Sequence, residues 1–180
     1  MRELVTHSGV ILISGAAGAG KSTVAHLLAK SMPRAAHIET DRLQDFLVSG
    51  RVRPNAVDQS EALRQLELRR RNQASLADNF NEVGIVPIID DVFPDPAQVA
   101  QLKAFLRARP LLLVTLSPPR SVAVERLVAR GRAEDPAFDH VRDLIFANRR
   151  ALGGLWIDNG DMTADETVAT ILGRVEDAVV

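Results

Sequence analysis

A glycine-rich stretch near the N-terminus constrains the fold of this chain more than any other feature. Residues 15–22 read GAAGAGKS, which matches the pattern G-x-x-x-x-G-K-[ST] at every fixed position. The apolar run Val10–Ser14 before it predicts a buried strand, and Ser22–Ser31 after it predicts a helix that stops before Pro33. Backbone N–H groups that turn inward at the start of a helix bind phosphate. The chain is therefore predicted to be an α/β domain with a phosphate-binding loop.

The residue types of this loop also predict what it binds. A lysine at position 21 can reach the β- and γ-phosphates of a nucleotide, and the hydroxyl of Ser22 can bind Mg²⁺. An unrelated Gly/Ala-rich turn would not need a buried strand on one side and a helix on the other. We therefore expect ATP and Mg²⁺ as cofactors. The residues expected to bind the nucleotide here are Gly15, Ala16, Ala17, Gly18, Ala19, Gly20, Lys21, Ser22 and Thr23.

Short apolar runs alternate with longer helical patterns along the chain, and this alternation is typical of a parallel α/β sheet. Length and composition favour a single domain over residues 1–180. We predict strands at residues 10–14, 36–39, 85–90, 111–117 and 155–158. We predict helices at residues 22–31, 41–48, 58–83, 96–107, 121–130, 137–152 and 163–178.

Two of these elements carry features that argue against them. Pro87 removes a hydrogen-bond donor from the third strand, although the apolar residues around it outweigh that objection. The helix at 58–83 opens with a cap formed by Asp58 and Glu61, but it is long for a chain of this size. A break near residues 69–72 is therefore an alternative.

Composition and charge exclude several classes of site. The chain has no cysteine, which excludes disulfides, thiol catalysis and cysteine-bound zinc or iron–sulfur clusters. A formal net charge of −1 argues against a protein that binds nucleic acid or a membrane surface. The first residues lack the apolar run of a signal peptide, and no stretch reaches the roughly 18 apolar residues of a membrane helix. We therefore expect a cytoplasmic protein whose partner is a small molecule; its oligomeric state stays open.

Motifs of other nucleotide-binding classes do not occur in the sequence. A GTPase would show D-x-x-G and N-K-x-D, and the chain contains neither. ABC-type and AAA-type motors need a longer domain and further signature segments. The class that remains is a small kinase, which transfers the γ-phosphoryl group to a bound acceptor.

A carboxylate follows the second predicted strand at Asp41. The carboxyl ends of parallel strands line the ligand crevice, so Asp41 and the neighbouring Arg42 are expected to face the acceptor. A carboxylate in that place can take the proton of an acceptor hydroxyl as the hydroxyl attacks. Alternatively, Asp41 is only the N-cap of the following helix, and the two roles are compatible.

Two further carboxylates, Asp90 and Asp91, end the third predicted strand. An aspartate that closes a strand beside the phosphate loop is the arrangement that binds Mg²⁺ directly or through water. Adjacent strand residues point to opposite faces, so the two should differ in role. We assign Asp90 to the metal together with Ser22, and Asp91 to the acceptor side, with the reverse assignment left open. A capped loop start is the alternative without a function.

Three arginines form a candidate lid. Arg126 and Arg130 are four residues apart on one face of a predicted helix, and Arg132 follows Gly131, a candidate hinge. Cations that close over the transferred phosphoryl group stabilise the charge on its oxygens. The alternative is a solvated arginine face at a helix end. The side chain of Arg70 has two possible orientations as well, either into the cleft or toward solvent.

The phosphate loop, the Asp41 segment and above all GIVPIIDDVFPDP at residues 84–96 resemble the chloramphenicol phosphotransferase-like branch of small P-loop kinases. The resemblance runs from about Val10 to Val175, and the IIDDVF stretch is its most specific part. It implies a three-layer fold, in which a five-stranded parallel sheet of order 2-3-1-4-5 has helices on both faces. It also implies a small arginine-rich lid at about 126–137.

The resemblance further implies roles for named residues. Asp41 would be the catalytic base. In related nucleotide and shikimate kinases the first arginine of the lid helix stacks on adenine and the second contacts the transferred phosphate; by position these are Arg126 and Arg130. The loop at 158–161 would lie near the adenine. Further nucleotide-binding candidates are thus Arg126, Arg132 and Asp158, and the candidate catalytic residues are Asp41, Lys21 and Arg130.

We expect the reaction to be transfer of the γ-phosphoryl group of ATP to a hydroxyl of a small molecule, either an antibiotic-like compound or a metabolite. Three alternatives remain: a polynucleotide 5′-hydroxyl kinase, a nucleotide-sugar kinase of the zeta-toxin type, and a non-catalytic nucleotide-binding protein. The near-neutral charge and the lack of an aromatic platform argue against the first. The missing switch motifs argue against the last.

Overall fold

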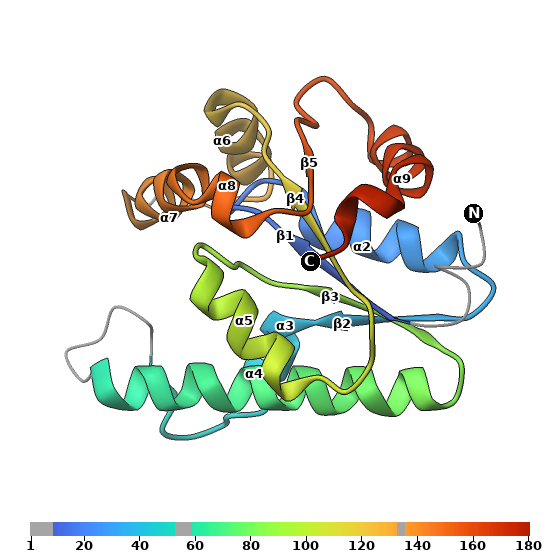
Figure 1. Ribbon diagram of the computed structural model, residues 1–180. Helices are drawn as coiled ribbons and strands as arrows, with labels where there is room; N and C mark the ends of the chain where they lie inside the picture. The colour runs from blue at the N-terminus through green and yellow to red at the C-terminus, as the bar shows by residue number, and fades with distance from the viewer. Residues whose placement is uncertain (1–8, 53–58, 133–135) are drawn as a thin grey trace.

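The computed structural model describes residues 9–52, 59–132 and 136–180, and at its centre lies a parallel sheet (Figure 1). The order of the strands is β2-β3-β1-β4-β5, and each neighbouring pair is parallel. This confirms the five-stranded parallel sheet and the strand order expected from the sequence. The strands are β1 (Val10–Ser14), β2 (Ala35–Glu39), β3 (Val86–Asp90), β4 (Leu111–Leu116) and β5 (Leu155–Ile157).

Helices connect the strands and cover the sheet (Figure 1). Within the described residues, none of them is both long and apolar enough to cross a membrane. The helices are α2 (Lys21–Lys30), α3 (Thr40–Asp45), α4 (Gln59–Glu82), α5 (Pro96–Phe105), α6 (Arg120–Val128), α7 (Pro136–Ala147), α8 (Arg149–Leu152) and α9 (Ala164–Gly173), followed by the 3-10 helix η1 (Val175–Ala178).

The helix expected at 137–152 is split into α7 and α8, and that prediction is corrected. Between the two helices, Asn148 turns its side-chain amide back to the carbonyl oxygens of Leu144 (3.1 Å) and Pro94 (3.2 Å). Asparagine side chains compete with the backbone for hydrogen bonds and so favour helix ends over helix interiors. The periodic apolar pattern of the sequence does not reveal this competition.

The structure also decides the end of the last helix and the continuity of α4. The last α-helix ends earlier than expected, at Gly173, and η1 continues it, while its capping box of Thr163 and Glu166 is present as predicted. The long helix α4 is continuous across residues 69–72, so the alternative with a break there is wrong. The cap expected at Asp58 lies outside the described residues.

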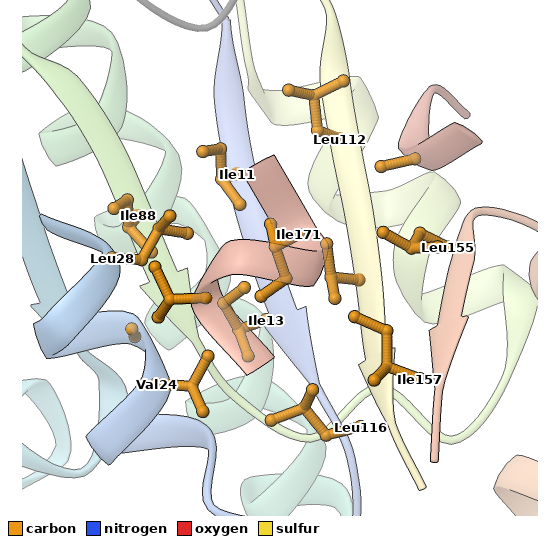
Figure 2. Packing of buried hydrophobic residues seen from close by; sticks show 14 of the residues in the cluster. Ile11, Ile13, Val24, Leu28, Ile88, Leu112, Leu116, Leu155, Ile157 and Ile171 are labelled. Carbon is orange, nitrogen blue, oxygen red and sulfur yellow. The ribbon is translucent and has the colours of Figure 1, made fainter. Parts of the chain in front are cut away.

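The sheet is buried on both faces because alternate strand residues point to opposite sides. Ile11 and Ile13 of β1 belong to a cluster with α2 and α9, whereas Val10 and Leu12 pack with α4 and α5. Figure 2 shows the first of these clusters, in which side chains of β1, β3, β4 and β5 meet α2 and α9. Helices on both faces give the three layers expected from the sequence.

Pro87 lies in β3, a strand that is paired with β1 on one side and with β2 on the other. A missing backbone donor there would leave a carbonyl oxygen of a neighbouring strand without its partner. In the ladder toward β1, the N–H of Asp91 donates to the oxygen of Ile13 (3.2 Å), and the two-residue repeat places position 87 opposite the carbonyl of Gly9. The side-chain amide of Asn81 donates to that carbonyl instead (3.2 Å). The strand therefore accommodates proline because a side chain replaces the lost donor.

Candidate active site

The phosphate loop, Asp41, Asp90 and Asp91 meet at the carboxyl edge of the sheet. The loop follows β1, and α3 begins directly after β2. The parallel register pairs Asp90 of β3 with Ile13 of β1 on one side and with Glu39 of β2 on the other. The three strands therefore end level with one another, which places these segments side by side.

The glycines of the phosphate loop are required by backbone conformation and by close packing. Gly18 and Gly20 have φ angles of 78° and 92°, in the left-handed region that other residues rarely adopt. A Cβ atom on Gly18 would lie 2.2 Å from the carbonyl oxygen of Ala123 in α6. The absence of a side chain therefore sets how closely the loop approaches α6.

Replacing Gly18 by alanine should lower both the stability of the fold and the affinity for ATP. Both losses should exceed those caused by the left-handed backbone conformation alone. Gly84→Ala is the matched control, because Gly84 has a similar φ of 71° and an added Cβ would lie in ordinary contact with the end of the Arg34 side chain, at 3.8 Å. Each variant incurs roughly 1–2 kcal/mol for the left-handed backbone, and only Gly18→Ala adds the contact with α6. Thermal unfolding and ATP titration measure the difference, and equal losses in the two variants would show that the close approach is unimportant.

Lys21 is the point on which the predicted catalytic groups converge. It begins α2, and its ammonium group donates to the carbonyl oxygen of Ala16 (3.1 Å). Burial lowers the pKa of Lys21, and three nearby carboxylates oppose that effect. The predicted base, metal ligand and lid cation thus lie within electrostatic reach of one ammonium group. The charged residues that act on it are Asp90, Asp91, Asp41 and Arg130.

Ser22 and Asp90, the two predicted metal ligands, are in direct contact. Ser22 Oγ donates to Asp90 Oδ2 at 2.5 Å, and Nε2 of His37 on β2 lies 3.1 Å from Asp90 Oδ1. Burial raises the pKa of Asp90, but the hydrogen bonds from His37 and Ser22 and the electrostatic effects of His37 and Lys21 together outweigh burial, so that the pKa lies below its ordinary value. Asp90 is therefore an ionised carboxylate held beside the first turn of α2.

This pair of residues fits a Mg²⁺ ion that is bound together with nucleotide phosphates. A hydroxyl and an ionised carboxylate are hard oxygen donors, and Mg²⁺ takes only one or two such protein ligands when phosphates and water supply the rest. Among residues 9–52, 59–132 and 136–180, no three histidine, aspartate or glutamate side chains come together as a metal site. The donor set therefore suits a cation that arrives with the nucleotide.

Asp41 lies in the first turn of α3, and its side chain is exposed. The N-cap of α3 is Glu39, so the alternative in which Asp41 caps the helix is wrong. Arg42, expected beside the acceptor, bonds through Nε to the carboxylate of Glu39 and is exposed. The carboxylate of Asp41 is thus accessible to a bound molecule, whereas Arg42 is paired within its own turn.

Asp91 is held in a buried polar network. Its carboxylate accepts hydrogen bonds from Gln73 Nε2 (2.9 Å), Arg69 Nη2 (3.3 Å) and the backbone N–H of Val92 (2.7 Å). Gln73 also donates to the hydroxyl of Thr40 at the start of α3. Asp91 is only 7% exposed, so this network ties α4 to the ends of β2 and β3.

Arg70, for which the sequence leaves two orientations, faces neither the cleft nor solvent. It is 4% exposed, bonds to Gln98 and Gln101 of α5, and lies over the ring of Phe93 at 5.5 Å. Its neighbour Arg69 reaches the site instead. One residue along a helix is a turn of about 100°, so the two side chains serve different neighbours.

Two of the lid arginines, Arg126 and Arg130, border a cavity of about 270 Å³ at the start of α2, together with Gly20 of the phosphate loop. Arg126 Nη2 donates to the carbonyl oxygen of Asn159 (2.9 Å), and Asn159 Nδ2 donates to that of Ala19 (3.0 Å). Arg130 Nη2 donates to the hydroxyl of Thr23 (3.2 Å). The fold thus brings both arginines to the loop, in the place where the sequence predicts the nucleotide.

Asp158 and Arg132, the remaining nucleotide-binding candidates, have exposed side chains. Asp158 bonds within its own loop, whereas the adjacent Asn159 lines the cavity. Of the expected lid, residues 133–135 lie outside the described residues.

The sequence interpretation does not identify four residues of this site, and each acts through a contact that only folding creates. His37 shows no metal-ligand spacing, and Gln73 resembles any polar residue of a helix. Asn159 could be found, since it lies in the loop already expected near the nucleotide. The four residues are His37, Arg69, Gln73 and Asn159.

Comparison with known proteins gives one family and a set of similar folds. The family described as "AAA domain" matches residues 10–152, which run from β1 through α8. That description names a domain class and no acceptor. Among curated proteins, none matches this sequence.

Three solved structures illustrate the similarity of fold. The tunicamycin resistance protein of Deinococcus radiodurans is 21% identical, with a TM-score of 0.69 over 97% of this chain and 99% of that one. A shikimate kinase from Acinetobacter baumannii in complex with shikimate is 20% identical, with a TM-score of 0.64 over 94% and 93%. A sugar kinase from Janibacter sp. HTCC2649 is 17% identical, with a TM-score of 0.61 over 96% of each chain.

At these sequence identities the similar structures show the fold of this chain, whereas the family match shows the family to which it belongs. The matched region contains the phosphate loop and all three site carboxylates. The chain therefore belongs to the AAA-domain family that matches residues 10–152, and its fold is that of the P-loop kinases.

Proposed function

We propose that this protein is an ATP-dependent phosphotransferase that moves the γ-phosphoryl group to a hydroxyl group of a small molecule. The observation that carries the proposal is the convergence on Lys21 of three charged groups: the exposed carboxylate of Asp41, the buried carboxylate of Asp90 and the guanidinium of Arg130. A protein that only binds nucleotide needs the lysine and the metal site but no base. Two similar folds are named as a sugar kinase and a shikimate kinase, which supports the same reaction class.

ATP with Mg²⁺ supplies the phosphoryl group and a cation that offsets its charge. Backbone N–H groups of residues 15–22 would hold the phosphates, with Ser22 and Asp90 facing the cation. Lys21 and Arg130 would stabilise negative charge on the transferred group, because preorganised cations in a partly dry site act strongly. We assign the adenine ring of ATP to the cavity of about 270 Å³ beside Arg126.

Asp41 is the residue we assign as general base. Two carboxylates lie on the acceptor side, and Asp91 already accepts hydrogen bonds from three donors. Those donors occupy lone pairs of the carboxylate that an acceptor hydroxyl would need. Asp41 is exposed at the same strand ends and is within electrostatic reach of Lys21.

The acceptor is assigned to a cavity of about 100 Å³ between α3 and α4. Its walls include the apolar side chains of Leu43, Leu47 and Leu66, together with Arg69 of the buried polar network. Phe46 at its edge is 76% exposed, and a large exposed apolar side chain beside a cavity is typical of a binding surface. The proposed acceptor therefore carries an apolar part next to the hydroxyl that reacts.

Within the family, the finer proposal is the branch that resembles chloramphenicol phosphotransferases. It is supported by the GIVPIIDDVFPDP stretch, which forms β3 and delivers Asp90 and Asp91 to the site. One similar fold is named as a tunicamycin resistance protein, which agrees with an antibiotic-like acceptor. A metabolite with an apolar part is the other acceptor of this kind.

The proposal is tested by measuring ATP consumption with Mg²⁺ and four sets of acceptors: hydroxylated antibiotics, sugars, nucleotide sugars and 5′-hydroxyl oligonucleotides. We expect a small hydroxylated molecule with an apolar part to raise consumption above the acceptor-free rate. Stimulation by oligonucleotides alone, or by nucleotide sugars alone, would replace the proposed acceptor class. ATP binding without consumption in any set would point to a non-catalytic protein.

Arg130→Ala should depress phosphoryl transfer and the slow acceptor-free hydrolysis of ATP together. Both reactions place charge on the phosphoryl oxygens, and loss of one preorganised donor typically lowers kcat by roughly 10²–10³-fold. Arg150→Ala, which changes an exposed arginine of α8, is the control. Loss of transfer with normal hydrolysis would instead place Arg130 at the acceptor.

Asp90→Asn should raise the Mg²⁺ concentration needed for half-maximal rate at fixed ATP. A neutral amide is a poorer ligand for Mg²⁺ than a carboxylate, so metal use should suffer more than acceptor use. Metal titrations of Asp90→Asn and Asp91→Asn, measured side by side, check the assignment. A shift in Asp91→Asn with an unchanged curve in Asp90→Asn would reverse the roles of the two residues.

A further inference from the structure

The ring of His37 reaches the metal-binding carboxylate from the neighbouring strand. In the parallel register His37 pairs with Ile88 and Glu39 pairs with Asp90, so His37 and Asp90 are diagonal neighbours on one face of the sheet. Their side chains are 14% and 4% exposed, and Nε2 lies 3.1 Å from Oδ1. The contact is therefore short, and it is largely shielded from water.

The protonation of this pair follows from the chemistry of its members. An aspartate carboxylate is ordinarily ionised near neutral pH and can then only accept hydrogen bonds. Nε2 of His37 therefore carries a hydrogen atom and donates a hydrogen bond to Oδ1. The other oxygen, Oδ2, accepts from the hydroxyl of Ser22. Two donors from different elements thus fix the plane of one carboxylate.

We propose that His37 is a positioning residue for the Mg²⁺ site: by holding Oδ1 of Asp90 it turns Oδ2 toward Ser22 and the first turn of α2. The inference rests on the proposed function, because a preset carboxylate matters only if a nucleotide-borne cation binds there. Without the ring donor, the carboxylate can rotate about its last side-chain bond, a torsion with broad preferences. Hydrogen bonds behind a metal ligand typically alter metal affinity by roughly 10–100-fold.

A second histidine on the same surface provides a matched control. His26 lies on α2, is exposed, and its ring centroid is 6.2 Å from that of His37. Both rings border an open cavity of about 380 Å³ together with Ser22. Replacing His26 therefore removes a histidine from this surface while the hydrogen bond between His37 and Asp90 is kept.

The test uses Mn²⁺ as a spectroscopic substitute for Mg²⁺. Binding of Mn²⁺ to the full chain in the presence of ADP is measured from the electron paramagnetic resonance signal of free Mn²⁺. His37→Leu lacks a donor, His37→Gln keeps an N–H at similar reach, and His26→Leu is the control. We expect His37→Leu to weaken Mn²⁺ binding by roughly 10–100-fold, with unchanged ADP affinity in the absence of metal. His37→Gln should recover most of the loss, and His26→Leu should match the wild type.

Each other outcome decides against the inference in a recognisable way. Equal Mn²⁺ binding by the wild type and His37→Leu would overturn it and leave the proposed function standing. Equal weakening in His37→Leu and His37→Gln would assign the effect to the volume of the ring and would also overturn it. A wild type that binds no Mn²⁺ with ADP would overturn both proposals. If His37→Leu does not fold, His37→Asn replaces it, because its shorter amide cannot reach Oδ1 of Asp90.

Discussion

Lys21→Ala is expected to abolish phosphoryl transfer while the protein stays folded. The substitution removes the cation on which the site carboxylates and Arg130 converge. Within the described residues, the Lys21 side chain donates one hydrogen bond, to the carbonyl oxygen of Ala16. Alanine favours helices, so the first turn of α2 is not weakened. By analogy with the loss of one preorganised donor, kcat should fall by at least roughly 10²–10³-fold.

The control for this variant is Lys30→Ala, which removes an exposed lysine from the last turn of the same helix. A coupled assay of ATP consumption with the best acceptor measures activity, and thermal unfolding measures stability. Lys30→Ala should behave as the wild type in both. Near-normal transfer by a folded Lys21→Ala protein would contradict the assignment of the phosphate loop.

Asp41→Asn is expected to lower kcat for transfer by roughly 10²–10⁴-fold, the usual contribution of a general base. The amide keeps nearly the shape of the carboxylate in the exposed first turn of α3 but cannot accept a proton. ATP affinity should change little, because the proposed function assigns Asp41 to the acceptor and not to the nucleotide. Acceptor-free hydrolysis should fall much less than transfer, since water does not depend on a base aimed at the acceptor hydroxyl.

Asp91→Asn is the informative comparison for Asp41→Asn. Asp91 accepts from Arg69 and Gln73 inside the protein, so its replacement should lower the midpoint of thermal unfolding. Asp41→Asn should leave that midpoint unchanged. If transfer to the true acceptor survived in Asp41→Asn and disappeared in a folded Asp91→Asn, the base would be Asp91.

The sheet could be predicted from the sequence because its signals are local. The run Val10–Ser14 is apolar on both faces, and the glycine loop after it has one structural context. The strand order came from resemblance to known kinases, and the structure confirms it. The helix end at Asn148 could not be predicted, and the strand containing Pro87 was predicted without the contact that accommodates the proline. Both depend on partners supplied by other segments, Pro94 and Asn81.

The residues of the candidate site likewise fall into those that a local motif predicts and those that only the folded chain brings together. The roles predicted for Lys21 and Ser22 follow from a motif whose chemistry lies within eight consecutive residues. The contact of His37 with Asp90 joins two strands that are far apart in sequence, so no spacing rule reveals it. Arg69 and Arg70 look alike on a helical stripe, and only the packing of α4 decides that Arg69 meets Asp91.

The most direct test of phosphoryl transfer is detection of the phosphorylated acceptor by mass spectrometry after incubation with ATP and Mg²⁺. With the wild type we predict that one small hydroxylated molecule gains a single phosphoryl group, in an amount equal to the ADP formed. The same acceptor should remain unmodified with Lys21→Ala and nearly so with Asp41→Asn. ATP consumption that releases only inorganic phosphate, with every acceptor unmodified, would contradict the proposed function.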